Sequence, residues 1–351
     1  VEDFSGNLWI SSQHGLFLIN KQNNLLYFTN IENNLNSLSF NYITSMFVDR
    51  TGILWIGTYG YGLNKIFPKL QNFNKYSSEN ITSHNISIKS IRAITEDNYG
   101  DLWIGGYYGL NKINRKTNLV SKYMNNIPIY SILHDPDKPN EILWIGKDGG
   151  GICKYYINSN KVVEFKTIKP NLVSGEVIYS IISSKDGYLW IGTNQGLFKF
   201  DRKNEKSTVF MYNSNNANSL SNNKVNVIYE DNSGFLLIGT DVGLNILNTK
   251  NEKFTQFFNN PNDSTSLSYN AILSIFEDKE NQIWIGTAGG GLNKFDRKTG
   301  KFIHFLKKDG LPDNVIYSIL SDENGNIWVS TNNGISKFIP KAILFGKCVF
   351  V

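Results

Sequence analysis

Cysteine is scarce in this sequence of 351 residues, which contains only Cys153 and Cys348. The two form no close-spaced pair, and the four histidines show none of the spacings that metal ligands share, so we expect neither a zinc site nor a disulfide framework. Gly-x-Ser-x-Gly, His-Glu-x-x-His and phosphate-loop motifs are missing as well. These absences remove the enzyme classes that depend on such motifs, and no metal or cofactor is expected.

Long apolar runs are also missing. The longest, Ala342 to Val351, is interrupted by Gly346 and Lys347 and has half the length needed to span a bilayer. The chain opens at Val1 inside a repeat, without the basic and apolar regions of a signal peptide. We therefore expect no membrane anchor in these residues and a truncated start.

Charge of one sign is only slightly in excess, with 35 Lys and Arg against 30 Asp and Glu. The cations are scattered through turns such as those at 201–203 and 296–298 and form no basic stripe. We expect no nucleic-acid partner and a mild preference for anionic partners.

What the sequence does contain is a repeat. All seven Trp lie in one motif, and Leu237 occupies the matching place in another copy. The eight positions, 41 to 48 residues apart, are Trp9, Trp55, Trp103, Trp144, Trp190, Leu237, Trp284 and Trp328. A period of this length is typical of solenoids and propellers, so it decides the fold before any other feature.

Each copy contains four short β-patterned runs separated by Asn, Asp, Gly and Ser. In the second copy they are Ile43 to Val48, Leu54 to Thr58, Gly62 to Ile66 and Phe73 to Tyr76, called strands A, B, C and D. Too few residues separate the runs for a crossover helix. The sequence predicts an all-β β-propeller of four-stranded antiparallel blades, with residues 1–351 as a single domain.

Three recurring positions have structural explanations. An Asp six residues before the Trp is expected to cap the A-to-B turn, with Ser184 in its place in the fifth copy. A Gly three residues before the Trp is expected to need a positive φ, and Asn281 replaces it in the seventh copy. A Gly two residues after the Trp allows close approach of the neighbouring backbone. We interpret the Trp itself as packing between blades rather than as a ligand platform.

The ends of the chain leave the blade count at seven or eight. Eight motifs favour eight blades. The partial first unit, residues 1–41, lacks its strand A, and residues 341–351 are either a closing strand for it or a truncated tail. The fourth copy departs from the pattern through three extra residues in 135–140.

The units resemble the two-component regulator propeller repeat, in which Glu-Asp-x-x-Gly-x-Leu-Trp-Ile-Gly-Thr recurs. Residues 95–105 and 276–287 are close matches, and the resemblance covers nearly the whole chain. It implies a periplasmic or extracellular sensor propeller, which in that family is followed by an immunoglobulin-like linker, a membrane helix and a histidine kinase or another output domain. Residues 310–338 resemble the last blade before the linker, and the family's seven-bladed rings then favour seven blades.

Strand direction alternates within a blade, so the B-to-C turns and the D-to-A connections share one face. The B-to-C turns vary between copies while the strands around them stay constant, which is typical of a binding surface on a rigid scaffold. The candidate ligand-binding residues are Tyr59, Tyr61, Tyr107, Tyr108, Lys147, Asp148, Asn194, Gln195 and Asp241. The four Tyr belong to consecutive blades and predict one aromatic patch suited to sugar rings. Alternatively, these Tyr only cover loop backbone.

Three functions remain open at this stage. The leading prediction is a sensor, not an enzyme, that binds an oligosaccharide or another extracellular small molecule and, as the resemblance implies, acts through a transmembrane kinase or other output module. A homodimer is also considered. The alternatives are a protein–protein interaction scaffold and a propeller glycosidase or polysaccharide lyase. Asp148 and Asp241 are the only acids at the variable turns, which weighs against the enzyme.

Overall fold

The structure is a computed structural model that describes residues 1–22, 24–32, 34, 37–50, 52–67, 72–76, 86–88, 90–165, 177–322 and 325–340. The predicted closing strand or tail at 341–351 lies outside these residues. The chain divides into two compact units, Val1–Ile178 and Tyr179–Val351, which are described separately. That residues 1–351 form a single domain stays a prediction.

The fold is an all-β, eight-bladed β-propeller, and each blade is an antiparallel sheet. Four blades lie in the first unit and consist of β1 (Leu8–Ser11), β2 (Leu16–Ile19) and β3 (Leu25–Phe28); β4 (Ile43–Val48), β5 (Leu54–Thr58), β6 (Leu63–Phe67) and β7 (Asn72–Tyr76); β8 (Ile91–Glu96), β9 (Leu102–Gly106), β10 (Gly109–Ile113) and β11 (Val120–Tyr123); and β12 (Ile129–His134), β13 (Ile142–Lys147), β14 (Ile152–Tyr156) and β15 (Lys161–Phe165).

The other four blades belong to the second unit, whose first strand begins at the boundary. They consist of β16 (Ile178–Ser183), β17 (Leu189–Thr193), β18 (Gly196–Asp201) and β19 (Lys206–Phe210); β20 (Val225–Glu230), β21 (Phe235–Thr240), β22 (Gly243–Asn248) and β23 (Lys253–Phe257); β24 (Ile272–Glu277), β25 (Ile283–Thr287), β26 (Leu292–Asp296) and β27 (Lys301–Phe305); and β28 (Ile316–Ser321), β29 (Ile327–Thr331) and β30 (Gly334–Phe338). A 3-10 turn, η1 (Lys307–Asp309), precedes the last blade. Among the described residues, no helix has the length and apolar character needed to cross a membrane.

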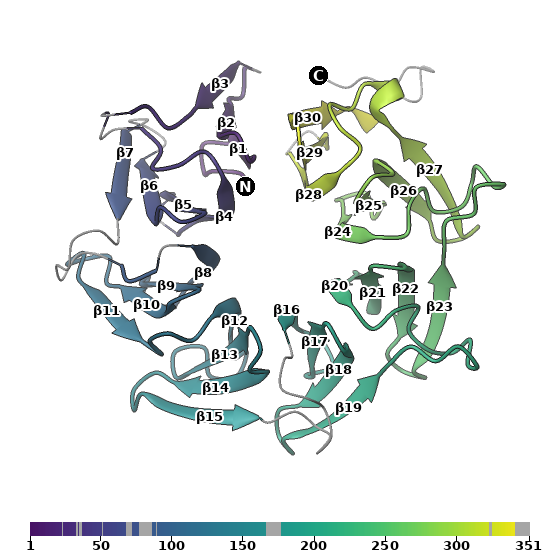
Figure 1. Cartoon of the computed structure of the whole chain (residues 1–351), viewed down its shortest axis with the longest axis horizontal. Helices are drawn as coiled ribbons and strands as arrows, with labels where there is room; N and C mark the ends of the chain where they lie inside the picture. Colours follow the sequence, from purple (N-terminus) through teal and green to yellow (C-terminus); the bar gives the residue numbers. More distant parts are fainter. Residues whose placement is uncertain are drawn as a thin grey trace. The chain divides into compact units, whose positions relative to one another are not determined.

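Strands pair with their neighbours in chain order, as the sequence predicts, so each blade is a meander from A to D (Figure 1). Of the two predicted blade counts, eight is confirmed. The count of seven, which the family resemblance favoured, is wrong for this chain. The described sheets have four strands except in the first and last blades, which have three. In the first blade the three strands correspond to B, C and D, and in the last to A, B and C.

The Trp side chains pack between blades, and this prediction is confirmed. In the first unit, Trp55 of β5 lies in a buried cluster with Ile91, Leu102 and Ile104 of the next blade. In the second unit, Trp284 packs in the same way against the last blade. The Gly two residues after each Trp makes room for the same contact: a methyl group at Gly239 would lie 2.6 Å from Ile272 Cγ2 of the following blade. The prediction of a close backbone approach is thus corrected: side chains of the next blade approach these glycines, and among the described residues a backbone atom does so only at Gly192.

The recurring Asp has two roles in each blade where it accompanies a Trp. Asp278 shows both: Oδ1 accepts the backbone N–H groups of Glu280 and Gln282 at 2.9 and 2.8 Å, which confirms the predicted turn cap. Oδ2 accepts the indole N–H of Trp284 at 2.8 Å. Equivalent bonds join Trp9 to Asp3, Trp55 to Asp49, Trp103 to Asp97, Trp144 to Asp135 and Trp328 to Asp322, at 2.5 to 3.1 Å. A charged acceptor of this kind makes burial of the indole N–H favourable.

A Lys of strand C lies over the Trp on the neighbouring strand B. The ammonium nitrogen is 4.8 to 5.7 Å from the ring centroid, which is cation–π distance. These pairs are Lys65 with Trp55, Lys112 with Trp103, Lys154 with Trp144, Lys199 with Trp190, Lys294 with Trp284 and Lys337 with Trp328. In the sixth blade both members change together, since Ile246 pairs with Leu237.

Two blades break the Asp–Trp pairing. In the fifth, Ser184 replaces the Asp, and the buried indole nitrogen of Trp190 has no hydrogen-bond partner. In the sixth, Leu237 replaces the Trp, and the carboxylate of Asp231 forms an ion pair with Arg297 of the seventh blade. An Arg in the same place of the third blade, Arg115, reaches back to Asp49 at 2.8 Å. The turn after strand C therefore ties a blade to its predecessor.

The D-to-A connections cover the outer edge of the following blade. Residues 213–220 run beside β23, where the Phe254 N–H donates to Asn218 Oδ1 at 2.7 Å and the Gln256 amide donates to the Ser219 carbonyl at 2.7 Å. The next connection covers the edge of β27 in the same way, since the Phe302 N–H donates to the Thr265 carbonyl at 2.8 Å. These bonds occupy strand edges that would otherwise offer unpaired backbone groups.

Candidate functional site

The first strand of a blade carries a β-bulge near the variable turns. In β8, Ile91 pairs with Gly106 and Ala93 with Gly105, so Arg92 is the extra residue between them. The same register shift in β4, β12, β20, β24 and β28 leaves Thr44, Tyr130, Asn226, Leu273 and Tyr317 as the extra residues. A bulge re-aims one side chain without ending the strand, and such positions are common beside functional sites.

In the first unit, the bulge residues Arg92 and Tyr130 meet the predicted site residue Tyr107. The Arg92 guanidinium lies 5.2 Å from the Tyr107 ring centroid and 5.0 Å from that of Tyr130. Its Nη2 donates to the Tyr107 hydroxyl at 3.1 Å, and the two hydroxyls are 3.2 Å apart. The rings are nearly perpendicular. A cation held against two aromatic faces gives this cluster a fixed geometry.

The hydrogen bond between the two phenols shifts their pKa values in opposite directions. The hydrogen bond with Tyr130, with help from Arg92, lowers the pKa of Tyr107 despite some burial. Burial and the bond to Tyr107 raise the pKa of Tyr130 to about 12. The Tyr107 oxygen accepts from Arg92 Nη2, and Arg92 is the charged member of the cluster.

The Tyr of the second blade form a separate aromatic group. Tyr59 and Tyr61 are about half exposed, at 47% and 52%. Tyr59 stacks on Tyr42 at 5.5 Å between centroids, and Tyr61 stacks on Phe40 at 4.5 Å. The described contacts thus keep Tyr59 and Tyr61 within the second blade and join Tyr107 to Tyr130 of the fourth. Tyr108, next to Tyr107 in the chain, is 48% exposed.

The two charged residues predicted beside the patch differ in their surroundings. Lys147 is buried, and its ammonium forms an ion pair with Glu164 of β15, so it stabilises the fourth blade. The backbone N–H of Asp148 donates to the Pro128 carbonyl at 3.0 Å. Its negative charge raises the pKa of both Tyr107 and Tyr130, as a minor effect. Asp148 therefore lies near the Arg92 cluster, whereas the Lys147 ammonium is paired with Glu164.

The second unit has its own cluster around Asp241. The Asp241 carboxylate accepts from Lys224 Nζ at 3.0 Å and from the bulge residue Asn226 at 2.8 Å. Lys224 in turn lies 5.8 Å from the Tyr179 ring centroid. The other two predicted residues, Asn194 and Gln195, are half-buried in the turn between β17 and β18. Asn194, Gln195 and Asp241 thus belong to the second unit, and the other six predicted site residues belong to the first.

Reasoning from the sequence missed the partners on strand A, namely Arg92, Tyr130, Tyr179 and Asn226. A signal for them exists in the repeat. The second residue of strand A changes from copy to copy, as in Thr44, Arg92 and Tyr130, whereas the residue before it is always Ile or Val. Variation inside an otherwise uniform strand indicates a residue that does not pack in the core.

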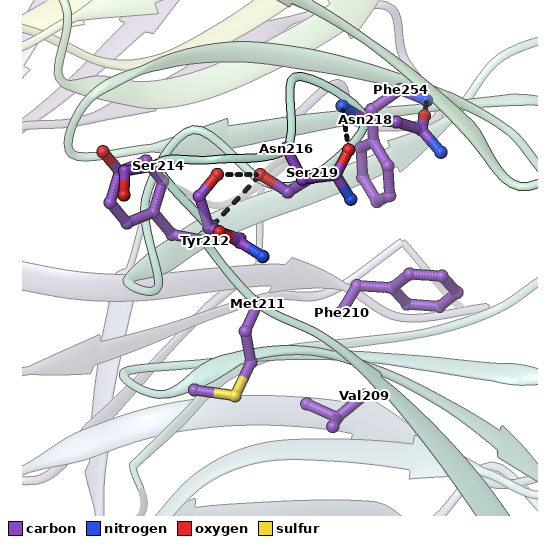
Figure 2. Close-up of a pocket in the computed structure, with 10 residues that line it drawn as sticks. Val209, Phe210, Met211, Tyr212, Ser214, Asn216, Asn218, Ser219 and Phe254 are labelled. Carbon is purple, nitrogen blue, oxygen red and sulfur yellow. Dashed lines mark hydrogen bonds between the residues drawn. The ribbon is translucent and has the colours of Figure 1, made fainter.

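A pocket of about 570 Å³ lies in the second unit, on the connection after β19 (Figure 2). Six residues of the connection after β19 line it, namely Tyr212, Asn213, Ser214, Asn216, Asn218 and Ser219. Figure 2 shows Val209, Phe210 and Met211 below Tyr212 and Ser219. Phe254 of β23 completes the lining. None of the nine predicted site residues lines this pocket.

Comparison with known families gives a match at six of the eight copies. A family model described as "Two component regulator propeller" matches residues 37–60, 85–108, 172–195, 219–242, 266–289 and 310–333. Each match ends in the turn between strands B and C. The turns that hold most of the predicted site residues are thus part of the family's repeat.

Individual relatives agree with this match. Histidine kinase P4 of Formosa agariphila is 28% identical over 201 residues, which are 52% of this chain and 14% of that protein. The extracellular domain of a putative hybrid two-component system from B. thetaiotaomicron has a TM-score of 0.62 at 21% identity, over 97% of this chain and 51% of that one. PorZ of Porphyromonas gingivalis, a bacterial surface component of the type-IX secretion system, has a TM-score of 0.65 at 14% identity, over 95% and 56%. These likenesses show the fold, and the chain spans only about half of the solved chains and a smaller part of the kinase.

Proposed function

Because the chain belongs to the two-component regulator propeller family, we propose that it is a non-catalytic sensor propeller that binds an extracellular small molecule, an oligosaccharide in the first place. The proposed binding surface is the set of turns around Arg92, Tyr107 and Tyr130. The observation that carries the proposal is the position of Arg92, which a β-bulge places between two Tyr rings.

The chemistry of the cluster supports a sugar ligand. Sugar rings present apolar C–H faces and polar rims, so they need aromatic surface beside fixed hydrogen-bonding groups. Tyr107 is half-buried and Tyr108 half exposed, and the Arg92–Tyr107–Tyr130 bonds fix the polar groups before any ligand arrives. Preorganisation of this kind lowers the entropic cost of binding.

The proposed setting of the domain is outside the cytoplasm, in a longer protein with an output module. A histidine kinase among the relatives and the extracellular domain of a putative hybrid two-component system support this setting. In such a protein, the ligand would act by binding one arrangement of the sensor more tightly than another, since only differential affinity shifts an equilibrium.

The proposal is tested by titrating a panel of oligosaccharides into the wild type and into a Tyr107→Ala, Tyr108→Ala double variant by calorimetry. Aromatic contacts contribute about 0.5 to 1.5 kcal/mol each, so the double variant should bind about 5- to 150-fold more weakly. Tyr99→Ala is the matched control, because Tyr99 is 71% exposed and lies in the A-to-B turn at the other end of the blade.

Unchanged affinity in the double variant would remove these turns from consideration. Absence of binding to every saccharide, together with a tight protein partner in pull-downs, would support the interaction scaffold instead.

A further inference from the structure

The pocket after β19 belongs to a loop type that occurs three times among the described residues. Residues 30–39, 212–221 and 259–268 share the sequence Ser-Leu-Ser at their ends. Their first backbone N–H donates to an Asn side chain eleven residues later, at 2.6 to 2.7 Å. The next N–H donates to the hydroxyl of the first Ser, at 2.9 to 3.1 Å. The three loops therefore have the same internal framework.

The residue whose side chain spans the loop is different in the middle copy. In the first and third loops it is Asn30 or Asn259. The Asn30 amide donates to the carbonyls of Leu38 and Ser39 at 2.7 and 3.2 Å. The Asn259 amide makes the same pair of bonds, at 2.8 and 3.1 Å, across the third loop. The middle loop has Tyr212 there, and its side chain is 51% exposed instead of bonded across the loop. The pocket is found at this loop.

The lining of the pocket is uncharged but rich in hydrogen-bonding groups. Its ten residues include no Asp, Glu, Lys or Arg. The other two loops carry an acid instead, Glu32 in the first and Asp263 in the third. A charged ligand would find no counter-ion in this lining, and burial of an unpaired charge is unfavourable.

The orientation of the amides sets which groups face a ligand. Asn213 accepts the N–H of Asn215 at 3.0 Å, and Asn216 accepts the N–H of Asn218 at 2.9 Å, so both amide oxygens are occupied. The amide nitrogens of Asn213 and Asn216 donate no hydrogen bond to another described residue, so they remain available as donors. Tyr212 and Met211 add exposed ring and thioether surface beside them.

We propose that this pocket is a second ligand site, for an uncharged hydroxyl-rich molecule with the size of one or two sugar rings. The volume of about 570 Å³ lies within the usual range of small-molecule sites. Hydroxyl oxygens of the ligand accept from the Asn213 and Asn216 amides, and an apolar ring face lies against Tyr212. The middle loop departs from the other two at the residue that bonds across the loop, and the pocket lies at this loop; a departure of this kind is the pattern expected of a functional position.

The decisive variant is Tyr212→Asn, which restores the residue of the other two loops. It is expected to fold with unchanged or higher thermal stability and to bind at least tenfold more weakly. The probes are maltose, cellobiose and lactose as neutral disaccharides and digalacturonate as the acidic one, followed by saturation-transfer NMR and calorimetry at millimolar concentration. The wild type should bind at least one neutral probe more tightly than digalacturonate.

A second variant separates ligand chemistry from loop shape. Asn216→Asp keeps the acceptor for the Asn218 N–H and matches Asp263 of the third loop, but it adds a negative charge to the lining. It should weaken digalacturonate further and change neutral binding by less than Tyr212→Asn does. Tyr269→Asn is the control, because Tyr269 is similarly exposed, at 47%, but does not line the pocket.

Three results would overturn the second site: no neutral probe binds, a neutral probe binds the Tyr212→Asn variant as tightly as the wild type, or digalacturonate is preferred. The Tyr107→Ala, Tyr108→Ala variant distinguishes this failure from failure of the proposed function. Binding lost in that variant and kept in Tyr212→Asn would leave the turn surface standing and refute the pocket. The reverse result would refute the turn surface alone.

Discussion

Replacing Ser184 with Asp should repair the one blade in which a Trp lacks its acceptor. The indole nitrogen of Trp190 is buried without a hydrogen-bond partner, whereas in six other blades an Asp Oδ2 accepts the indole N–H. Ser184→Asp places a carboxylate at the equivalent position. Lys199 stands over the Trp190 ring, as Lys112 stands over Trp103, and supplies positive charge nearby.

The size of the effect follows from three contributions. A hydrogen bond to a charged acceptor contributes about 1.5 to 3 kcal/mol, and it also removes the cost of the unpaired indole N–H. Against this, the Ser184 hydroxyl loses its bonds to Asp186 and to the Tyr188 carbonyl, together about 1 to 2 kcal/mol. Desolvation of the new carboxylate reduces the gain further. We expect a net stabilisation of about 1 kcal/mol.

The measurement is guanidinium unfolding followed by circular dichroism, with two-dimensional NMR of the indole N–H signals as the local probe. One of the seven indole signals should shift downfield and exchange more slowly with solvent in Ser184→Asp. Ser184→Asn is the control, because it offers an oxygen without the charge. The mirror variant Asp97→Ser should lose about 2 to 3 kcal/mol, since it leaves Trp103 without its acceptor and Lys112 with Asp101 as its remaining ion-pair partner. Destabilisation by Ser184→Asp, or an Asp97→Ser protein as stable as the wild type, would refute the pairing as a source of stability.

Three further predictions concern other buried groups. Asp231→Ala should cost about 1 to 2 kcal/mol in guanidinium unfolding, because it leaves the partly exposed Arg297 without its ion pair; an unchanged midpoint would contradict this. Burial raises the pKa of the Cys153 thiol to about 12, so this residue should resist iodoacetamide at pH 8 until denaturant is added, as checked by mass spectrometry of its peptide. The raised pKa of Tyr130, about 12 against an ordinary value of 10, means that its contribution to stability is complete below pH 10 and is lost as the pH rises towards 12. Burial also raises the pKa of Tyr155 and of Tyr229, so ultraviolet absorbance titration should show several tyrosines titrating late, and Tyr107→Phe should bring one of them, Tyr130, earlier.

The repeat was enough to predict the architecture because its pattern is set by packing. The positions of Trp284 and Gly286 carry the same residue in almost every copy of the repeat. Both residues contact the next blade, so the sequence repeats wherever that contact is formed. Asn281, with φ of 58°, likewise confirms the expected left-handed turn residue. These features depend on residues close together in one copy, and periodicity shows them directly.

The site was harder to predict because it depends on a register shift. Alternation along Ile91 to Glu96 gives a uniform strand, and nothing in a single copy shows that Arg92 is the extra residue of a bulge. The second role of the recurring Asp was missed for a related reason. Its spacing to the Trp was noticed, but a turn cap already explained it, and only the structure shows the second oxygen on the indole. The exceptions at Ser184 and Leu237 were the available hint, since a pure turn cap has no need of a Trp.

The covering of one blade's edge by the connection from the previous blade has a practical consequence for anyone who wants to cut the propeller into fragments. A piece that begins at Val225, the start of a strand, would discard the Asn218 and Ser219 groups that bind β23 and leave that edge open to self-association. A piece that begins after β19 would keep them. The separable module is thus offset from the sheet: it starts with the connection that covers its own outer strand, and it ends before the next connection.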